Sequence, residues 1–152
     1  MKNIAHIMKN TVLSLVLVLL VAGCSRQTEN NVVPSAAGPE AVAQKAAEQW
    51  LALVDAGNYA ESWKTAAGYF QTAVPQSQWE QTIAGVRKPL GDLVSRKLKS
   101  AQYAKSLPGA PDGEYVVLQF DTSFANKKTA VETVTPMLDK DGAWKVSGYY
   151  IK

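Results

Sequence analysis

The last part of the sequence predicts a β-hairpin. It reads TAVETVTPMLDKDGAWKVSGYYIK, from Thr129 to Lys152. Two runs rich in β-branched and aromatic residues flank the turn-forming stretch DKDG, which is the pattern of two antiparallel strands. If KDG forms a three-residue loop, Gly142 takes the left-handed backbone conformation that such a loop requires. The chain is therefore expected to end in an antiparallel sheet.

Two more strands are predicted immediately before this hairpin. LVSRKLKSAQY alternates in polarity, and EYVVLQFDTSF is rich in β-branched and aromatic residues, while LPGAPDG and ANKK read as a loop and a turn. One face of the first of these strands would carry Val94, Arg96 and Leu98. The first strand would lie at the sheet edge, where lysines hinder pairing with other chains. This is a simpler explanation than a basic binding patch for Lys97, Lys99 and Lys105.

Upstream of the strands, apolar residues recur at helical spacing in three segments. The first helix is expected to begin at Pro39 and to end before Gly57, and the second to follow Asn58 as its N-cap. Gly68 weakens the second helix and is a candidate for its end. The third runs from about Pro75 until Pro89 stops it. The apolar positions in step are Ala43, Ala47, Trp50, Leu51, Val54, Tyr59, Trp63, Ala66, Ala67, Phe70, Trp79, Ile83 and Val86. Tryptophans at this spacing are expected in the core rather than on a stacking platform. Helices followed by a four-stranded antiparallel sheet indicate an α+β fold, with helices covering one sheet face.

Composition allows one domain and gives no case for nucleic-acid binding. The 152 residues are 47% apolar and 19% charged, as in a globular protein. The net charge is +3, and two of the bases, Lys2 and Lys9, lie near the N-terminus. Without them, 14 basic residues face 13 acidic ones, whereas nucleic acid is bound by strongly basic surfaces.

The N-terminal segment has the layout of a secretory signal peptide. Lys2 and Lys9 precede the apolar run VLSLVLVLLV, which ends at Val21. The alternative is a membrane-spanning helix, which needs about 20 apolar residues, roughly twice this run.

The small residues after the run, Val21-Ala22-Gly23-Cys24, resemble the lipobox of bacterial lipoproteins. The resemblance implies cleavage after Gly23 and transfer of a diacylglycerol to the thiol of Cys24, whose new amine is then acylated. The alternative is a stray or buried cysteine, but a lone exposed thiol would be a liability in an exported protein. The resemblance also implies the outer membrane, because Ser25 rather than Asp follows the cysteine.

These features divide the chain into a signal peptide (1–23), a flexible tether (24–38) and a domain (39–152). Several acyl chains give firm attachment, since each buried CH₂ contributes about 0.8 kcal/mol. The tether is polar, contains Pro34 and would span on the order of 20 Å as a coil. The alternative, an ordered first strand, fits poorly with Asn30-Asn31 and with this proline.

Cleavage would leave the mature chain without an imidazole or a free thiol. It removes His6, the only histidine, and acylation blocks Cys24. Nucleophile arrangements of the Ser-His or Cys-His kind and Cys/His zinc sites are then excluded. No motif for a metal, a phosphate group or an organic cofactor is found, so any catalysis would depend on carboxylates, Lys or Tyr.

Several stretches resemble a bacterial family catalogued as domain of unknown function 4019. They are WKTAAGYF, VRKPLG, SRKLKSAQY, LPGAPDGEYVVLQF, AVETVT and DGAWKVSGYYIK, and the similarity extends from about Glu40 to Lys152. This family looks related to the nuclear-transport-factor-2-like (cystatin-like α+β) superfamily. The resemblance implies a curved sheet wrapped around helices to form a cone with a pocket. It implies no activity, because the superfamily contains isomerases, dehydratases and non-enzymatic binding domains.

One end of the predicted apolar sheet face collects polar side chains. With three-residue loops in both hairpins, Glu132 would lie across from Thr122 and Tyr150, and Arg96 would face the same way. A one-residue slip would put Glu132 beside Asp121, an unfavourable pair of like charges. The set is either a small ligand pocket or a structural ion pair of Glu132 with Arg96 or Arg87, because a buried carboxylate needs a partner in both cases.

Three functions are compatible with these observations. The first is a lipid-anchored envelope domain that binds a partner protein or a small ligand without catalysis. The second is an enzyme of the isomerase or dehydratase type, with Glu132 as the base and Tyr150 as a hydrogen-bond donor. The third is a structural envelope lipoprotein, which would need a large exposed apolar patch for assembly.

Overall fold

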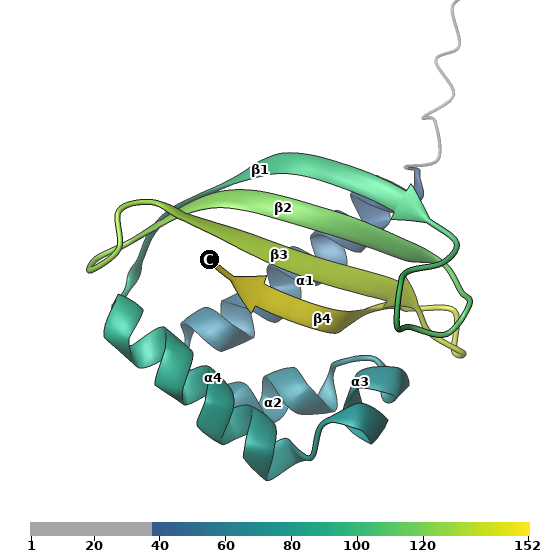
Figure 1. Cartoon of the computed structure of the whole chain (residues 1–152), viewed down its shortest axis with the longest axis horizontal. Helices are drawn as coiled ribbons and strands as arrows, with labels where there is room; N and C mark the ends of the chain where they lie inside the picture. Colours follow the sequence, from purple (N-terminus) through teal and green to yellow (C-terminus); the bar gives the residue numbers. More distant parts are fainter. Residues whose placement is uncertain (1–37) are drawn as a thin grey trace, which may run out of the picture. The chain divides into compact units, whose positions relative to one another are not determined.

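The computed structural model describes residues 38–152, and the predictions for the signal peptide, Gly23, Cys24, Ser25 and most of the tether lie outside them. The described part is an α+β fold, as predicted, with its helices before its strands (Figure 1). The elements are α1 (Pro39–Asp55), α2 (Tyr59–Lys64), α3 (Gly68–Ala73), α4 (Gln76–Leu90), β1 (Leu93–Ala104), β2 (Tyr115–Phe124), β3 (Ala130–Leu138) and β4 (Trp144–Ile151).

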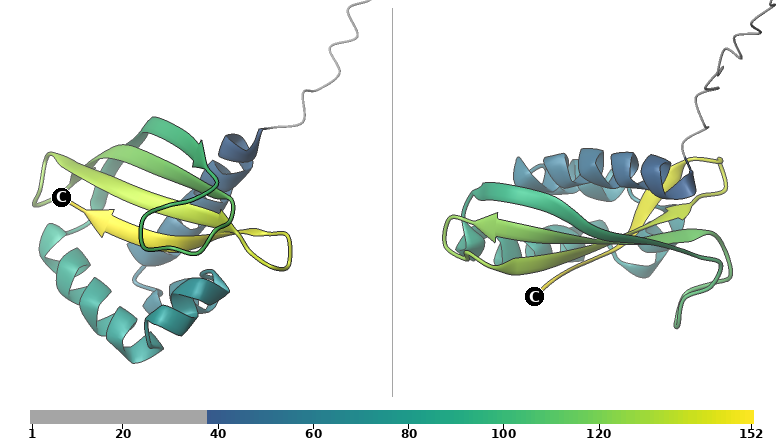
Figure 2. Two further views of the ribbon diagram at one scale, coloured as in Figure 1. Left: turned by 45° about the vertical axis from the view of Figure 1, so that its right-hand side comes forward. Right: turned by 90° about the horizontal axis from the view of Figure 1, so that it is seen from above.

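The four strands form one antiparallel sheet in the order β1-β2-β3-β4. The sheet is curved and open, and α1 runs across one of its faces (Figure 2). The other three helices lie beyond the free edge of β4 (Figure 1). Strand β1 forms the opposite edge, as the sequence predicts. Both the relationship to the nuclear-transport-factor-2-like superfamily and the cone remain predictions.

The core lies between α1 and the sheet and continues among the shorter helices. Trp50 and Trp79 are buried, and their indole N–H groups donate to the carbonyl and to the hydroxyl of Ser62 respectively. Phe70 and Tyr149 meet these indoles mostly edge-on, with ring centroids 5.1–6.5 Å apart. The prediction that tryptophans pack in the core is confirmed for this pair, and their polar ends have the partners that burial requires.

The second predicted helix is divided into two short helices, α2 and α3, because the backbone between them bonds to strand β4. Ala67 has an extended conformation, and its N–H donates to the carbonyl of Val146 on the free edge of β4. Asn58 is the N-cap residue of α2, as predicted, but its side chain makes no capping hydrogen bond. Helix α4 continues through Pro89 to Leu90. This proline leaves the carbonyl of Gly85 without its helical donor, but Gly85 is exposed to water and the helix ends one residue after the proline.

The hairpins set which residues lie opposite one another. The β3–β4 loop is as predicted, with Gly142 at φ 79°. The β2–β3 turn is shorter than predicted, because Phe124 and Lys127 exchange hydrogen bonds around two central residues. One extra residue then stands before Ala130, which pairs with Thr122, so Glu132 pairs with Phe120 and not with Thr122. A shift of two residues leaves every side chain on its predicted face.

A β-bulge in β4 overturns one prediction. Thr135 pairs with Gly148 but Pro136 pairs with Val146, so one extra residue stands in β4. Proline has no N–H to give to a ladder and is found in sheets at such irregularities. The extra residue reverses the alternation, so Tyr149 and not Tyr150 faces the helices. The side chain of Tyr150 is 62% exposed.

The assignment of the side chains of β2 to the core face or the outer face of the sheet can be tested with two neighbouring residues. Leu118 is completely buried, while Val117 lies on the other face and is half-buried. We expect Leu118→Ala to lower the free energy of unfolding by about 2–5 kcal/mol, because it leaves a cavity in the core. Val117→Ala should cost less than about 1.5 kcal/mol, because little volume is left unfilled. Urea titration measures both values, and equal losses would contradict the assigned faces.

Candidate functional site

The carboxylate of Glu132 is the centre of a buried polar cluster. The side chain is fully buried. Arg96 approaches it with two groups, Nε at 2.6 Å from Oε2 and Nη2 at 3.1 Å from Oε1. The hydroxyl of Thr122 donates to Oε2 at 2.7 Å, and the hydroxyl of Tyr149 donates to Oε1. Four donor groups thus bind one carboxylate, and they come from one residue each of β1, β2 and β4.

The helices complete this cluster through Asp55 and Arg87. Arg96 donates to both oxygens of Asp55, at 2.7 and 3.0 Å, and Arg87 donates to the same carboxylate at 2.7 Å. The Nη1 atom of Arg87 lies 3.6 Å from Glu132, and its guanidinium lies 4.4 Å from the ring centre of Phe124. Two arginines therefore balance two carboxylates, which is what burial of charges requires.

The structure brings together three of the four residues that the sequence groups: Arg96, Thr122 and Glu132. Tyr150 does not belong to the cluster, and Tyr149 takes its place. The sequence contains the signal for this exchange, because Pro136 inside an otherwise regular strand indicates a bulge.

Asp55 is the member of the cluster that sequence reasoning missed. It is the last residue of α1. An acidic side chain is unfavourable at the negative end of a helix dipole unless a cation stands beside it. Its position was thus a signal for a nearby cation, although the sequence could not show which one.

Charge interactions in the cluster favour the ionised forms of Glu132 and Arg96. Burial alone would raise the pKa of Glu132, but the hydrogen bonds and charge of Arg96, with those of Tyr149 and Thr122, bring it below its ordinary value. Burial likewise opposes the charge of Arg96, yet its carboxylate partners raise its pKa. Burial and the neighbouring carboxylate raise the pKa of Tyr149, so its hydroxyl stays protonated as a donor.

This geometry suits a structural joint better than a reactive site. Both oxygens of Glu132 are occupied, and the side chain has no exposed surface. The two arginines were the alternative partners in the ion-pair interpretation, and both contact Glu132. Within residues 38–152, no three His, Cys, Asp or Glu side chains gather closely enough to hold a metal ion.

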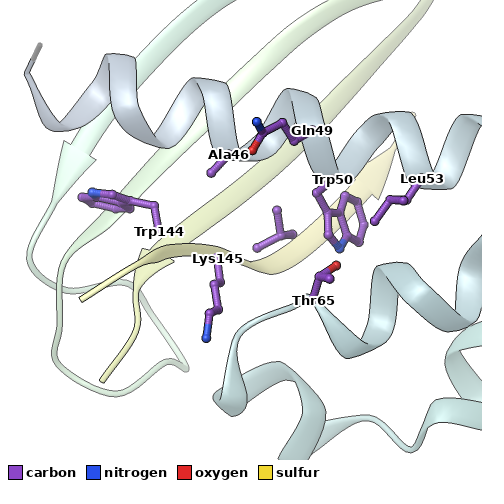
Figure 3. Close-up of a pocket in the computed structure, with 8 residues that line it drawn as sticks. Ala46, Gln49, Trp50, Leu53, Thr65, Trp144 and Lys145 are labelled. Atoms are coloured by element: carbon purple, nitrogen blue, oxygen red, sulfur yellow. The ribbon is translucent and has the colours of Figure 1, made fainter. Parts of the chain in front are cut away.

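Hollows that could hold a ligand lie at the surface, and the two larger ones are outside the charged cluster. The first, the α1–β4 hollow, has a volume of about 340 Å³ (Figure 3). Its walls are Ala46, Gln49, Trp50, Leu53, Thr65, Trp144, Lys145 and Val146. A second hollow of about 570 Å³ lies between α3, the β1–β2 loop and the β3–β4 hairpin. A third of about 230 Å³ opens beside Asp55 and Arg87. The first two have volumes usual for small-molecule sites.

Comparison with known proteins places the sequence in a family. The model of the family described as "Protein of unknown function (DUF4019)" matches residues 46–149. The chain belongs to this family. The match covers α1 from its middle onward and all four strands except the end of β4, so it includes Asp55 and Glu132. Searches of curated proteins and of solved structures gave no match. In the part of the chain from residue 38 on, no helix is both long and apolar enough to cross a membrane.

The contribution of the cluster to the free energy of unfolding can be tested by comparing a buried carboxylate with an exposed one. Glu132→Gln leaves two arginines facing one carboxylate in the interior, so we expect a loss of about 3–5 kcal/mol in the free energy of unfolding. Asp121→Asn is the matched control, because Asp121 also pairs with a cation of β1, Lys99, but both side chains are more than half exposed. It should cost less than about 1 kcal/mol. Similar losses in the two variants would show that the cluster is not a structural joint.

The same cluster makes stability depend on acid pH. The folded-state pKa of Glu132 lies below its ordinary value of 4.5, so its contribution is fully present above about that pH. It is lost as the pH falls through the folded-state pKa. The stability difference between the wild type and Glu132→Gln should therefore be constant near neutral pH and narrow below about pH 4.5. Chemical unfolding at a series of pH values measures this difference, and a gap that widens in acid would contradict the assignment.

Proposed function

We propose that the protein is a lipid-anchored domain of the bacterial envelope that binds a small ligand or a partner protein without catalysing a reaction. The lipobox-like sequence around Cys24 supports attachment, and Gly23 would be the last residue removed. Ser25 supports the outer membrane, with the domain facing the periplasm at the end of a tether. The curved, open sheet with a helix on one face is compatible with the nuclear-transport-factor-2-like superfamily, in which binding domains are common.

The proposal that the domain does not catalyse a reaction is supported by the burial and pairing of the Glu132 carboxylate. A general base must be within hydrogen-bond reach of its substrate. Glu132 has no exposed surface and is held by Arg96 through two hydrogen bonds. The alternative, an isomerase or dehydratase that uses this carboxylate, would need the cluster to open and leave Arg96 partly unpaired.

A purely structural role in assembly has less support than binding. It calls for a large continuous apolar patch. Among residues 38–152, the exposed large apolar side chains come from five different elements, and they are Val42, Tyr69, Val86, Val94 and Tyr150. Apolar residues scattered in this way are ordinary for a protein surface. The surface hollows are therefore the better candidates for a function.

Lipid attachment can be tested with the thiol itself. We expect cells that express the full chain to incorporate labelled palmitate into it and to carry it in the outer-membrane fraction. Cys24→Ala should lose the label, retain residues 1–23 and leave that fraction, because no acyl chain holds it. Ser25→Asp should keep the label but move to the inner membrane. An unlabelled wild type, or a Cys24→Ala variant that fractionates normally, would refute the anchor.

A further inference from the structure

Two indole rings line the α1–β4 hollow. Trp50 and Trp144 lie at its two ends, with Ala46 and Gln49 of α1 along one side (Figure 3). Trp144 packs against the core with part of its surface but remains partly exposed. An aromatic ring supported on one side and open on the other offers a flat apolar surface to a ligand.

Polar groups with unused hydrogen-bonding capacity stand beside these rings. Within residues 38–152, neither the amide of Gln49 nor the indole N–H of Trp144 has a hydrogen-bond partner, and Gln49 is exposed. The hydroxyl of Thr65 donates to the carbonyl of Glu61, so its oxygen can still accept. The hollow therefore offers both donors and acceptors to a ligand.

The charge around the hollow favours an uncharged ligand. No acidic residue lines it, and its one cation, Lys145, extends away from α1 (Figure 3). The ammonium group of Lys145 is held by Asp141 and by Asp139, the latter at 3.3 Å. An anion would have to compete with these two carboxylates, and a cation would find no carboxylate in the walls.

We propose that the α1–β4 hollow is a binding site for a neutral saccharide, an inference that specifies the ligand class of the proposed binding function. Sugar rings have C–H groups on their faces and hydroxyl groups around their rims. The partly exposed ring of Trp144 matches one face of a sugar, whereas Trp50, which is only 4% exposed, closes the end of the hollow. The amide of Gln49, the indole N–H of Trp144 and the hydroxyl of Thr65 match the rim. The volume of about 340 Å³ suits part of an oligosaccharide, with the remainder outside in solvent.

The second hollow has a different character. Its lining includes Tyr69, Pro111, Met137 and Leu138, and the one aromatic hydroxyl there is already used, because Tyr69 donates to the carbonyl of Gly109. Such a surface suits a more apolar ligand. A variant in this hollow is therefore the internal control for the position of the saccharide site.

The test is an NMR titration of the full chain in detergent micelles with tri-N-acetylchitotriose, followed through the indole N–H signals. The four tryptophans, Trp50, Trp63, Trp79 and Trp144, give four such signals. We expect the signal of Trp144 to shift most at millimolar sugar, and that of Trp50 to shift less, because its N–H is already bonded to the carbonyl of Ser62. The signals of Trp63 and Trp79, which do not line the hollow, should shift least. Trp144→Ala should weaken binding about tenfold, because the open stacking surface is lost. The variant Gln49→Ala should weaken it severalfold.

Matched controls separate the site from general effects on the fold. Gln44→Ala on α1 and Tyr150→Ala on the opposite face of β4 should bind as the wild type does. Unchanged affinity in Trp144→Ala, or loss only in Tyr69→Ala, would overturn the assignment of the hollow. Absence of shifts with chitotriose, cellotriose and maltotriose would overturn the ligand class. The titration does not depend on acylation, so a failed palmitate label would refute the anchor and leave this site intact.

Discussion

The fold depends on satisfying one buried carboxylate. Glu132 of β3 receives hydrogen bonds from Arg96 of β1, Thr122 of β2 and Tyr149 of β4, so a single charge connects every strand of the sheet. Asp55 then links Arg96 to the end of α1 and to Arg87 of α4. A packing that displaced Arg96 would leave an uncompensated charge in the interior, which costs far more than a misplaced apolar contact. We infer that the cluster selects one arrangement of helices on sheet, beyond what apolar burial alone would specify.

The sequence predicted the parts of the fold that local periodicity controls. Four strands, the edge position of β1 and the loop at Gly142 follow from alternation and turn residues, and α1 follows from its apolar stripe. The sequence marked Gly68 as a weak point of the second helix, but the position of the break depends on the hydrogen bond from Ala67 to Val146, which lies far away in the sequence. The β2–β3 register was wrong by two residues for a similar reason. The three-residue loop predicted from the turn residues is instead a two-residue turn closed by Phe124 and Lys127, with one extra residue before Ala130.

The sequence also predicted those members of the cluster whose position follows from alternation within a strand. Grouping Arg96, Thr122 and Glu132 needed only the facing of each strand, which a register error of two residues preserves. Tyr149 was missed because the bulge in β4 exchanges the two faces of the strand beyond it. Pro136 indicated this bulge, but the prediction assumed a regular strand. Asp55 was missed because α1 and the strands are separated by three other helices, and alternation within a strand carries no information about which helix end approaches it.

The buried cluster and the proposed binding surface are joined by packing, which gives the cluster a role without catalysis. Tyr149 donates to Glu132, and its ring lies 5.4 Å from that of Trp50 in an edge-on contact. Trp50 is held at its other end by the carbonyl of Ser62. This indole therefore has a fixed orientation where it lines the α1–β4 hollow. Because ordering a side chain on binding costs free energy, a wall that is already ordered leaves more of the contact energy for affinity. A locked, charge-balanced interior is what a rigid binding surface requires, whereas a catalytic carboxylate would need access that Glu132 does not have.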